Sequence, residues 1–105
     1  MKYYKLKKQS DFEKLFKKGK RAFSSSLTMI YRPAQRTVMG ISVGKRHGKS
    51  VQRNRIKRLI REAFRSQLPL LKNNYAFLFI PKVLEKYDFH VYKKHIGQMI
   101  EKDGL

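Results

Sequence analysis

The sequence contains no cysteine and no tryptophan among its 105 residues. The lack of cysteine excludes disulfide bonds and thiolate metal sites, and it fits a reducing compartment. The opening residues, MKYYKLKK, are not followed by the apolar segment of a secretory signal peptide, and no apolar run is long enough to cross a bilayer. We therefore expect a cytoplasmic protein that has no membrane partner.

Acidic side chains are also scarce, with seven Asp or Glu against 26 Lys or Arg and a formal net charge of +19. Between Lys14 and Arg61 there are 15 basic residues and no acid. Solubility alone does not require such a charge, so it predicts a polyanionic partner, with nucleic acid favoured over an anionic membrane. A chain of this length makes one domain with a single modest core.

The few acids also weaken the case for an active site on the protein. All seven can be explained as helix caps or helix surface, and no set of nucleophile, base and orienting residue can be assembled. His90 and His95 are five residues apart, which is the wrong spacing for two metal ligands on one helix face. We expect neither a catalytic residue nor a metal ligand on this chain.

The densest positive charge lies between Lys45 and Arg65, a segment with nine Lys or Arg residues and one acid, Glu62. From about Ser50 onward its pattern predicts a helix with two opposite stripes. The apolar stripe consists of Ile56, Leu59, Ile60, Ala63 and Phe64. The polar stripe and its flanks consist of Asn54, Arg58, Arg61, Arg65, Arg55 and Lys57. Like charges one turn apart destabilise a helix by about 0.2–0.5 kcal/mol per pair, so a helix that keeps them is predicted to bind a polyanion.

The basic loop before this helix occupies the place of a Walker A loop. That motif needs four residues between its glycines, whereas three residues separate Gly44 from Gly48. We therefore reject a nucleotide cofactor, although free amides and the positive end of the helix dipole still suit a phosphate. His47 lies among glycines and cations that disfavour its protonation, and we interpret it as an ordinary loop residue.

Helices are predicted near both ends of the chain. Ser10 to Glu13 fits a capping box, with a first helix that ends at Gly19. Its Phe12, Leu15 and Phe16 lie on one side, where Leu15 fits the core and the two Phe residues leave room for a stacking surface. Asp88 can cap a last helix that packs inward through Tyr92, Ile96, Met99 and Ile100.

Strands are predicted between these helices. Leu27–Arg32 alternates, with Leu27, Met29 and Tyr31 on one face, and Thr37–Val43 is expected to pair back on it after a turn. Phe23–Ser26 is either a separate strand or an irregular entry to the first. Tyr75–Ile80 is almost wholly apolar, which is typical of a central strand buried on both faces, and Pro81 ends it.

The central segment resembles the bacterial ribonuclease P protein subunit. The shared pattern is a strand, a basic loop and a helix that opens with Arg-Asn-Arg; here these are Gly40–Val43, Lys45-Arg46 with Gly48, and Val51–Glu62. The resemblance continues upstream in Asp11–Gly19 and, more weakly, downstream in the apolar strand that ends at Pro81. It therefore covers nearly the whole chain, and its central motif is highly specific.

This resemblance implies an α/β two-layer sandwich in the order α-β-β-β-α-β-α, with a four-stranded sheet and a left-handed β-α-β crossover. General rules would predict a right-handed one. It also implies an RNA-binding domain, residues 1–105, that joins a catalytic RNA and helps it remove the 5′ leader of precursor tRNA. The chemistry would belong to Mg²⁺ bound by the RNA, and the protein would be monomeric in the complex.

The resemblance also implies roles for individual residues. The helix would meet the catalytic RNA through Arg53, Asn54, Arg55, Lys57, Arg58, Arg61 and Arg65. A cleft between the first helix and the sheet would hold the leader through Phe12, Phe16 and the position of Ile30, with its phosphates near Lys45, Arg46 and Lys49. The family often has an aromatic residue at the position of Ile30, so the third stacking contact is in question here.

Two other functions are compatible with a basic domain of this size. A non-catalytic structural RNA-binding protein, such as a small ribosomal protein, would share the charge but would not need the aromatic pair beside the Arg-Asn-Arg helix. An independent protein nuclease would need the acids and histidines that the sequence does not bring together.

Overall fold

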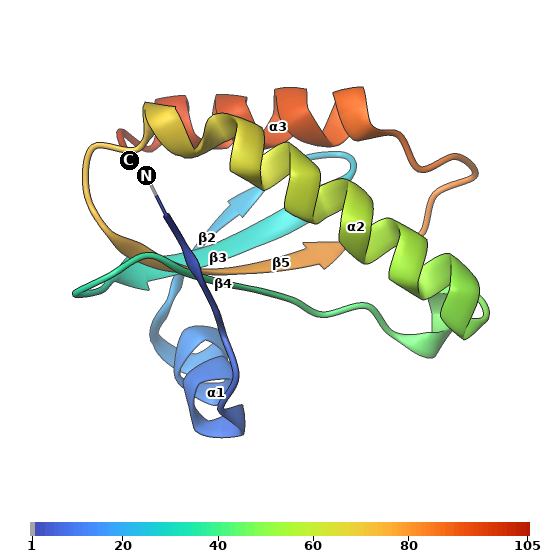
Figure 1. The fold of residues 1–105 in the computed structure, drawn as a ribbon, viewed down its shortest axis with the longest axis horizontal. Helices are drawn as coiled ribbons and strands as arrows, with labels where there is room; N and C mark the ends of the chain where they lie inside the picture. The colour runs from blue at the N-terminus through green and yellow to red at the C-terminus, as the bar shows by residue number, and fades with distance from the viewer. Residues whose placement is uncertain (1) are drawn as a thin grey trace.

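The computed structural model describes residues 2–105, which form one five-stranded sheet with helices on both of its faces (Figure 1). None of its helices within this range is long and apolar enough to cross a membrane. The elements in chain order are β1 (Tyr4–Lys5), α1 (Gln9–Lys18), β2 (Lys20–Phe23), β3 (Leu27–Pro33), β4 (Val38–Ile41), the 3-10 helix η1 (Lys45–His47), α2 (Ser50–Gln67), the 3-10 helix η2 (Leu68–Leu70), β5 (Tyr75–Pro81) and α3 (Phe89–Lys102).

The sheet has the order β1-β4-β5-β3-β2, with β5 at its centre. β5 pairs antiparallel with β3 and parallel with β4, and β2 pairs antiparallel with β3 at one edge. α2 joins the neighbouring parallel strands β4 and β5 through a left-handed connection (Figure 1). Such connections are right-handed in about 98% of proteins, so the handedness expected from the resemblance is confirmed against the general rule.

Two sequence-based expectations about the sheet are wrong. β4 does not pair back on β3 as a hairpin, because β5 lies between them and bonds to both. The sheet also has five strands and not four, since Tyr4 and Lys5 of the basic arm pair in parallel with Val38 and Met39. Only a strand that is apolar on both faces can fill the centre of a covered sheet, and β5 is that strand.

The larger core lies between the sheet and the pair α2–α3, which covers one face of the sheet (Figure 1). Phe64 of α2 packs on Phe77 and Phe79 of β5, with ring centroids 5.2 and 5.4 Å apart. The expected inward residues of α3 are all buried in this core: Tyr92, Ile96, Met99 and Ile100.

α1 covers part of the opposite face of the sheet, where it builds a smaller core (Figure 1). This core contains Leu6, Leu15, Ile30 and Leu78, all buried, so the core role expected for Leu15 is confirmed. The alternation of β3 is also confirmed, since Leu27, Met29 and Tyr31 belong to the larger core and Ile30 to the smaller one. With α1 on this side, both faces of β5 are covered.

The ends of the helices test the predicted caps. Asp88 caps α3, because its carboxylate accepts the backbone N–H of His90 at 2.7 Å. The capping box at Ser10 is wrong: the N-cap of α1 is Lys8, two residues earlier, and no side chain caps that end. Gly19 ends α1 as expected, and its N–H donates to the carbonyl of Leu15 at 2.9 Å.

Candidate RNA-binding surfaces

The long helix α2 has the two stripes that its sequence predicts. Four apolar side chains on one side are buried: Ile56, Ile60, Ala63 and Phe64. Five of the expected RNA-binding residues are exposed: Asn54, Arg55, Arg58, Arg61 and Arg65. Arg53 and Lys57 are partly buried, and no described residue accepts a hydrogen bond from the buried Nε of Arg53. The helix is thus fixed by its apolar side and exposes a row of cations.

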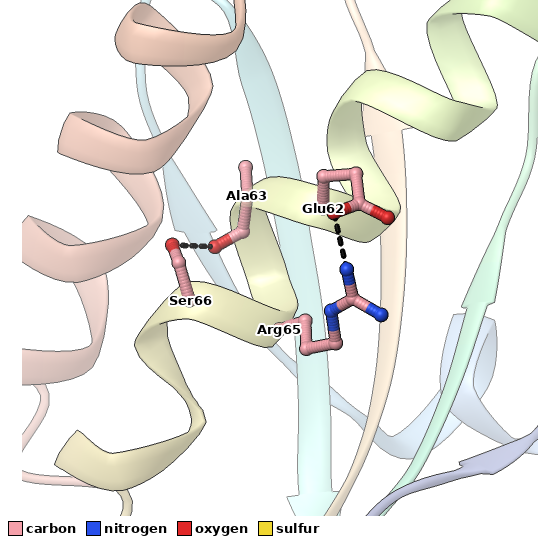
Figure 2. A network of polar contacts seen from close by, with 4 residues as sticks. All are labelled: Glu62, Ala63, Arg65 and Ser66. Atoms are coloured by element: carbon pink, nitrogen blue, oxygen red, sulfur yellow. Dashed lines mark hydrogen bonds and ion pairs between the residues drawn. The ribbon is translucent and has the colours of Figure 1, made fainter.

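Arg65 differs from the other cations of this row. Its guanidinium forms an ion pair with Glu62 at 2.5 Å, one turn back on the same helix (Figure 2). Within the described part of the chain this is the only ion pair, so Arg58 and Arg61 have no carboxylate partner there. Ser66, the next residue, donates to the carbonyl of Ala63 at 2.7 Å and takes no part in this ion pair (Figure 2).

The second surface is the face of the sheet that carries α1, and the strand register defines it. Residues paired across neighbouring strands form rows that run across the sheet. One row contains Arg21, Ile30, Leu78 and Gly40. α1 lies over this row: Ile30 and Leu78 are fully buried, and a Cβ added to Gly40 would lie 3.0 Å from the ring of Phe12.

Ile30 therefore has no exposed surface for the leader contact that the resemblance implies. The methyl carbon Cγ2 of Ile30 lies only 2.5 Å from where a Cβ would stand on Gly19, at the end of α1. The alternation of β3 places Ile30 on the correct face, but α1 covers that position.

The neighbouring row is left uncovered. It consists of Phe23, Thr28, Ile80 and Ser42, whose N–H donates to the carbonyl of Phe79 at 2.9 Å. Phe23 is 68% exposed, and Thr28 and Ile80 are partly exposed. We call this row the uncovered strip.

Two aromatic residues of α1 lie on the side of that helix that faces the uncovered strip. Asp11 and Lys14 line a groove on the opposite side of α1. At about 100° per residue, Phe12 and Phe16 therefore project towards the strip. Phe16 is 42% exposed, and Arg21 is fixed beside it by a hydrogen bond to its carbonyl at 2.9 Å.

Sequence reasoning missed Phe23 as a member of this surface. Its segment was left open between a strand and an irregular entry, so the face on which the ring lies was not assigned. The sequence did contain a signal for its exposure. The residues two positions away from Phe23, Arg21 and Ser25, are both polar, so the alternation of a strand gives Phe23 no apolar neighbour on its own face. The register Phe23–Thr28 then places the ring on the α1 face of the sheet.

The two surfaces approach each other at the β1 edge of the sheet. A groove of about 450 Å³ is lined there by Phe12 of α1, by Ile41 of β4, and by Lys57 and Arg61 of α2. Residues on opposite sides of the sheet thus share one surface depression.

The basic loop lies at the end of β4, where the uncovered strip also ends. Lys45, Arg46 and Lys49 are all exposed there, on η1 and at the N-cap of α2. His47 is buried between them, with its Nδ1 2.8 Å from the hydroxyl of Tyr87, and is thus not the ordinary loop residue that we expected. Burial, followed by the charge of Arg46, lowers the pKa of His47.

Other features of the described chain bear on chemistry. No group of three or more His, Cys, Asp or Glu residues between positions 2 and 105 lies close enough to hold a metal ion. His95 contacts Ser26, with its Nδ1 2.6 Å from the hydroxyl oxygen. The side chains exposed on the surfaces described above are mainly cations and aromatic rings.

Comparison with known proteins decides the family. The family model described as Ribonuclease P matches residues 1–103. The chain belongs to the ribonuclease P protein family. It is 40% identical to the ribonuclease P protein component of Dictyoglomus turgidum over 95% of this chain and 88% of that protein. It is 38% identical to the ribonuclease P protein component of Clostridium kluyveri over 100% of this chain and 98% of that protein.

Solved structures agree with this family. The ribonuclease P protein of Thermotoga maritima superimposes with a TM-score of 0.82 at 25% identity, over 93% of this chain and 96% of that one. The ribonuclease P protein of Staphylococcus aureus superimposes with a TM-score of 0.82 at 25% identity, over 97% of this chain and 96% of that one. A ribonuclease P protein component is a subunit of an endoribonuclease that acts in tRNA processing, and it has an RNA partner.

The buried His47 predicts a pH dependence of folding. Its folded-state pKa lies below the ordinary value of about 6.5, so the unfolded chain takes up the proton first. The resulting stability is present above pH 6.5 and is lost as the pH falls through the folded-state pKa. We expect the free energy of unfolding, measured with urea, to fall from pH 7 to pH 5, and to fall less in His47→Gln.

The pKa of His95 is also lowered by burial, so His95→Gln measures its separate share of the same decline. An unchanged slope against pH in both variants would show that neither imidazole is responsible.

Proposed function

We propose that this chain binds a catalytic RNA through α2 and holds the 5′ leader of precursor tRNA along the uncovered strip. The observation that carries this proposal is the groove in which Phe12 lies with Lys57 and Arg61. It joins a cationic helix, suited to a structured RNA, to an aromatic surface, suited to a single strand. One protein molecule in each complex can then position the leader relative to the catalytic RNA.

The contact with the catalytic RNA is assigned to the exposed side of α2. Guanidinium groups bind phosphates through two parallel hydrogen bonds, and the rigid helix fixes their spacing. The residues proposed for this contact are Arg53, Asn54, Arg55, Lys57, Arg58, Arg61 and Arg65. Within this set Arg65 has the weakest claim, because Glu62 already neutralises part of its charge.

The leader contact is assigned to Phe12, Phe16 and Phe23, with phosphates near Lys45, Arg46 and Lys49. Each exposed ring offers a face on which a base can stack, and such stacking depends little on base identity. Phe23 takes the role that the resemblance gave to the position of Ile30, which is buried. A surface of this kind suits leaders of varied sequence.

Cleavage itself is assigned to the RNA partner. Mg²⁺ bound by the RNA would supply the activated water and stabilise the leaving oxygen, without ligands from this chain. The protein residues contribute binding and orientation, and they reduce the repulsion between two polyanions that must approach each other. A structural RNA-binding protein of the ribosomal type would need the cations alone, so the exposed rings of Phe16 and Phe23 favour the leader-binding role.

The proposal is tested by reconstitution with a bacterial ribonuclease P RNA at low Mg²⁺. We expect the protein to increase correct cleavage of precursor tRNA, because it neutralises phosphates that Mg²⁺ must otherwise screen. The protein alone is expected to leave precursor tRNA intact. No stimulation by a folded sample would contradict the proposed function, and cleavage at the mature 5′ end by protein free of RNA would place the chemistry on the chain.

The basic helix predicts different effects for two neighbouring arginines. Arg61→Ala should weaken binding to the catalytic RNA and lower the slope of log K against log salt by about 0.7–0.9 for one lost phosphate contact. Arg65→Ala should change that slope less, because its ion pair with Glu62 competes with a phosphate. Filter binding at four salt concentrations measures both slopes. Equal slopes for wild type and Arg61→Ala would remove this residue from the interface.

The exposed Phe rings of the proposed leader site predict a loss of binding that depends on the leader. Phe16→Ala and Phe23→Ala should each weaken binding of precursor tRNA to the reconstituted enzyme by about 1–3 kcal/mol, as for a lost base stack. Binding of mature tRNA should not change, because only the precursor carries the single strand. Both rings are exposed, so urea unfolding should show little loss of stability.

Leu70→Ala is the matched control, since Leu70 is a 52% exposed apolar residue of η2, outside the strip. Equal losses for precursor and mature tRNA, or a Phe23→Ala variant that binds like the control, would exclude Phe23 from the leader site.

A further inference from the structure

A large groove lies on the other side of α1 from the uncovered strip. It has a volume of about 1060 Å³ and lies between the N-terminal arm, α1 and the turn that follows β3. Six cations and one carboxylate, that of Asp11, line it. The cations are Lys5, Lys7, Lys8, Lys14, Arg32 and Arg36. The roles proposed so far use none of these six residues.

The floor and one wall of this groove are suited to a nucleobase. Leu15 is buried beneath it, and Val38 and Ala76 are partly exposed, so the floor is apolar. On the wall, the guanidinium carbon of Arg36 lies 4.2 Å from the ring centroid of Tyr4, which is 47% exposed. A guanidinium stacked on an aromatic ring keeps its edge N–H groups free for phosphate or base oxygens.

The cationic turn is held in place before any ligand arrives. Thr37 donates to the side-chain oxygen of Asn74 at 3.0 Å, and the Asn74 amide donates to the carbonyl of Gln35 at 3.1 Å. The N–H of Tyr4 donates to the carbonyl of Thr37 at 2.9 Å, which fixes the arm against the same turn. Arg36 therefore projects from a backbone that loses little freedom on binding.

We propose that this groove binds a single-stranded segment of the RNA subunit, separate from the leader. An apolar floor, a stacked ring and surrounding cations together match an unpaired strand, whose bases can enter the groove; the bases of a duplex remain stacked and paired. The helix α1 lies between this groove and the uncovered strip, and the groove of Phe12 adjoins it at the N-terminal arm, where Lys5 and Leu6 line both. We assign the two sides of α1 to different strands. In this arrangement α1 lies between two RNA strands.

The charge of the groove is tested with Lys14→Gln/Arg36→Gln against Lys86→Gln/Lys93→Gln, which removes two exposed charges elsewhere. We expect the groove variant to bind a bacterial ribonuclease P RNA several-fold more weakly than the control. The slope against log salt should fall by about 1.4, or 0.7 for each lost single-strand contact. The difference in affinity between long-leader and short-leader precursor tRNA should be unchanged. Equal slopes in the two variants would overturn the proposal.

The position of the RNA is tested by crosslinking. The chain has no cysteine, so Gln35→Cys, in the groove wall, gives one site for an azidophenacyl photo-crosslinker. We expect crosslinks to unpaired nucleotides of the RNA subunit. Crosslinks only to the leader, only to duplex, or to no RNA would contradict the proposal, as would groove-dependent binding to phosphatidylglycerol vesicles without RNA crosslinks.

This inference rests on the proposed function, and the two can fail separately. If the wild-type chain does not bind the RNA subunit, the proposed function is wrong. If it binds and is stimulated normally while the groove variant matches its control, only the groove assignment is wrong.

Discussion

The burial of β5 on both of its faces is the constraint on which the rest of this structure depends. Phe77 and Phe79 need cover on one face and Leu78 on the other, and all three are fully buried. α2 and α3 supply the first cover, and α1 supplies the second. α1 has ten residues and covers only the middle rows of the sheet, so a groove remains on each side of it. The proposed RNA sites follow from this incomplete cover.

The sequence predicted those elements that depend only on residues near one another in the chain. The two stripes of α2 follow from the helical period, the central strand follows from an unbroken apolar run, and the cap at Asp88 follows from its side chain. The pairing of β3 with β4 failed because strand order depends on competition among distant segments. A short turn favours a hairpin, but β5 gains more buried surface in the centre than β4 would. The pairing of Tyr4 and Lys5 with β4 could not be predicted, because a strand of two residues is too short to show an alternating pattern.

The binding surfaces were predictable to different degrees for the same reason. On α2 the residue spacing alone separates the exposed cations from the core, so the sequence identified them individually. On the sheet, alternation assigns a face but cannot say which rows a helix will cover. Ile30 and Phe23 both lie on the α1 face; the first is fully buried and the second is 68% exposed. Only the position of α1 across the strands distinguishes them.

The remaining question is how a helix tolerates so many neighbouring cations without a partner. Each like-charged pair costs about 0.2–0.5 kcal/mol, whereas a fully buried Ile or Phe side chain contributes about 1.5–3 kcal/mol. Ile56, Ile60 and Phe64 are fully buried, so their burial exceeds the repulsion among Arg58, Arg61 and their neighbours. The core therefore holds the charges close together before RNA arrives. In the proposed complex, phosphates that enter this field would relieve the repulsion, so RNA binding and the stability of α2 would reinforce each other.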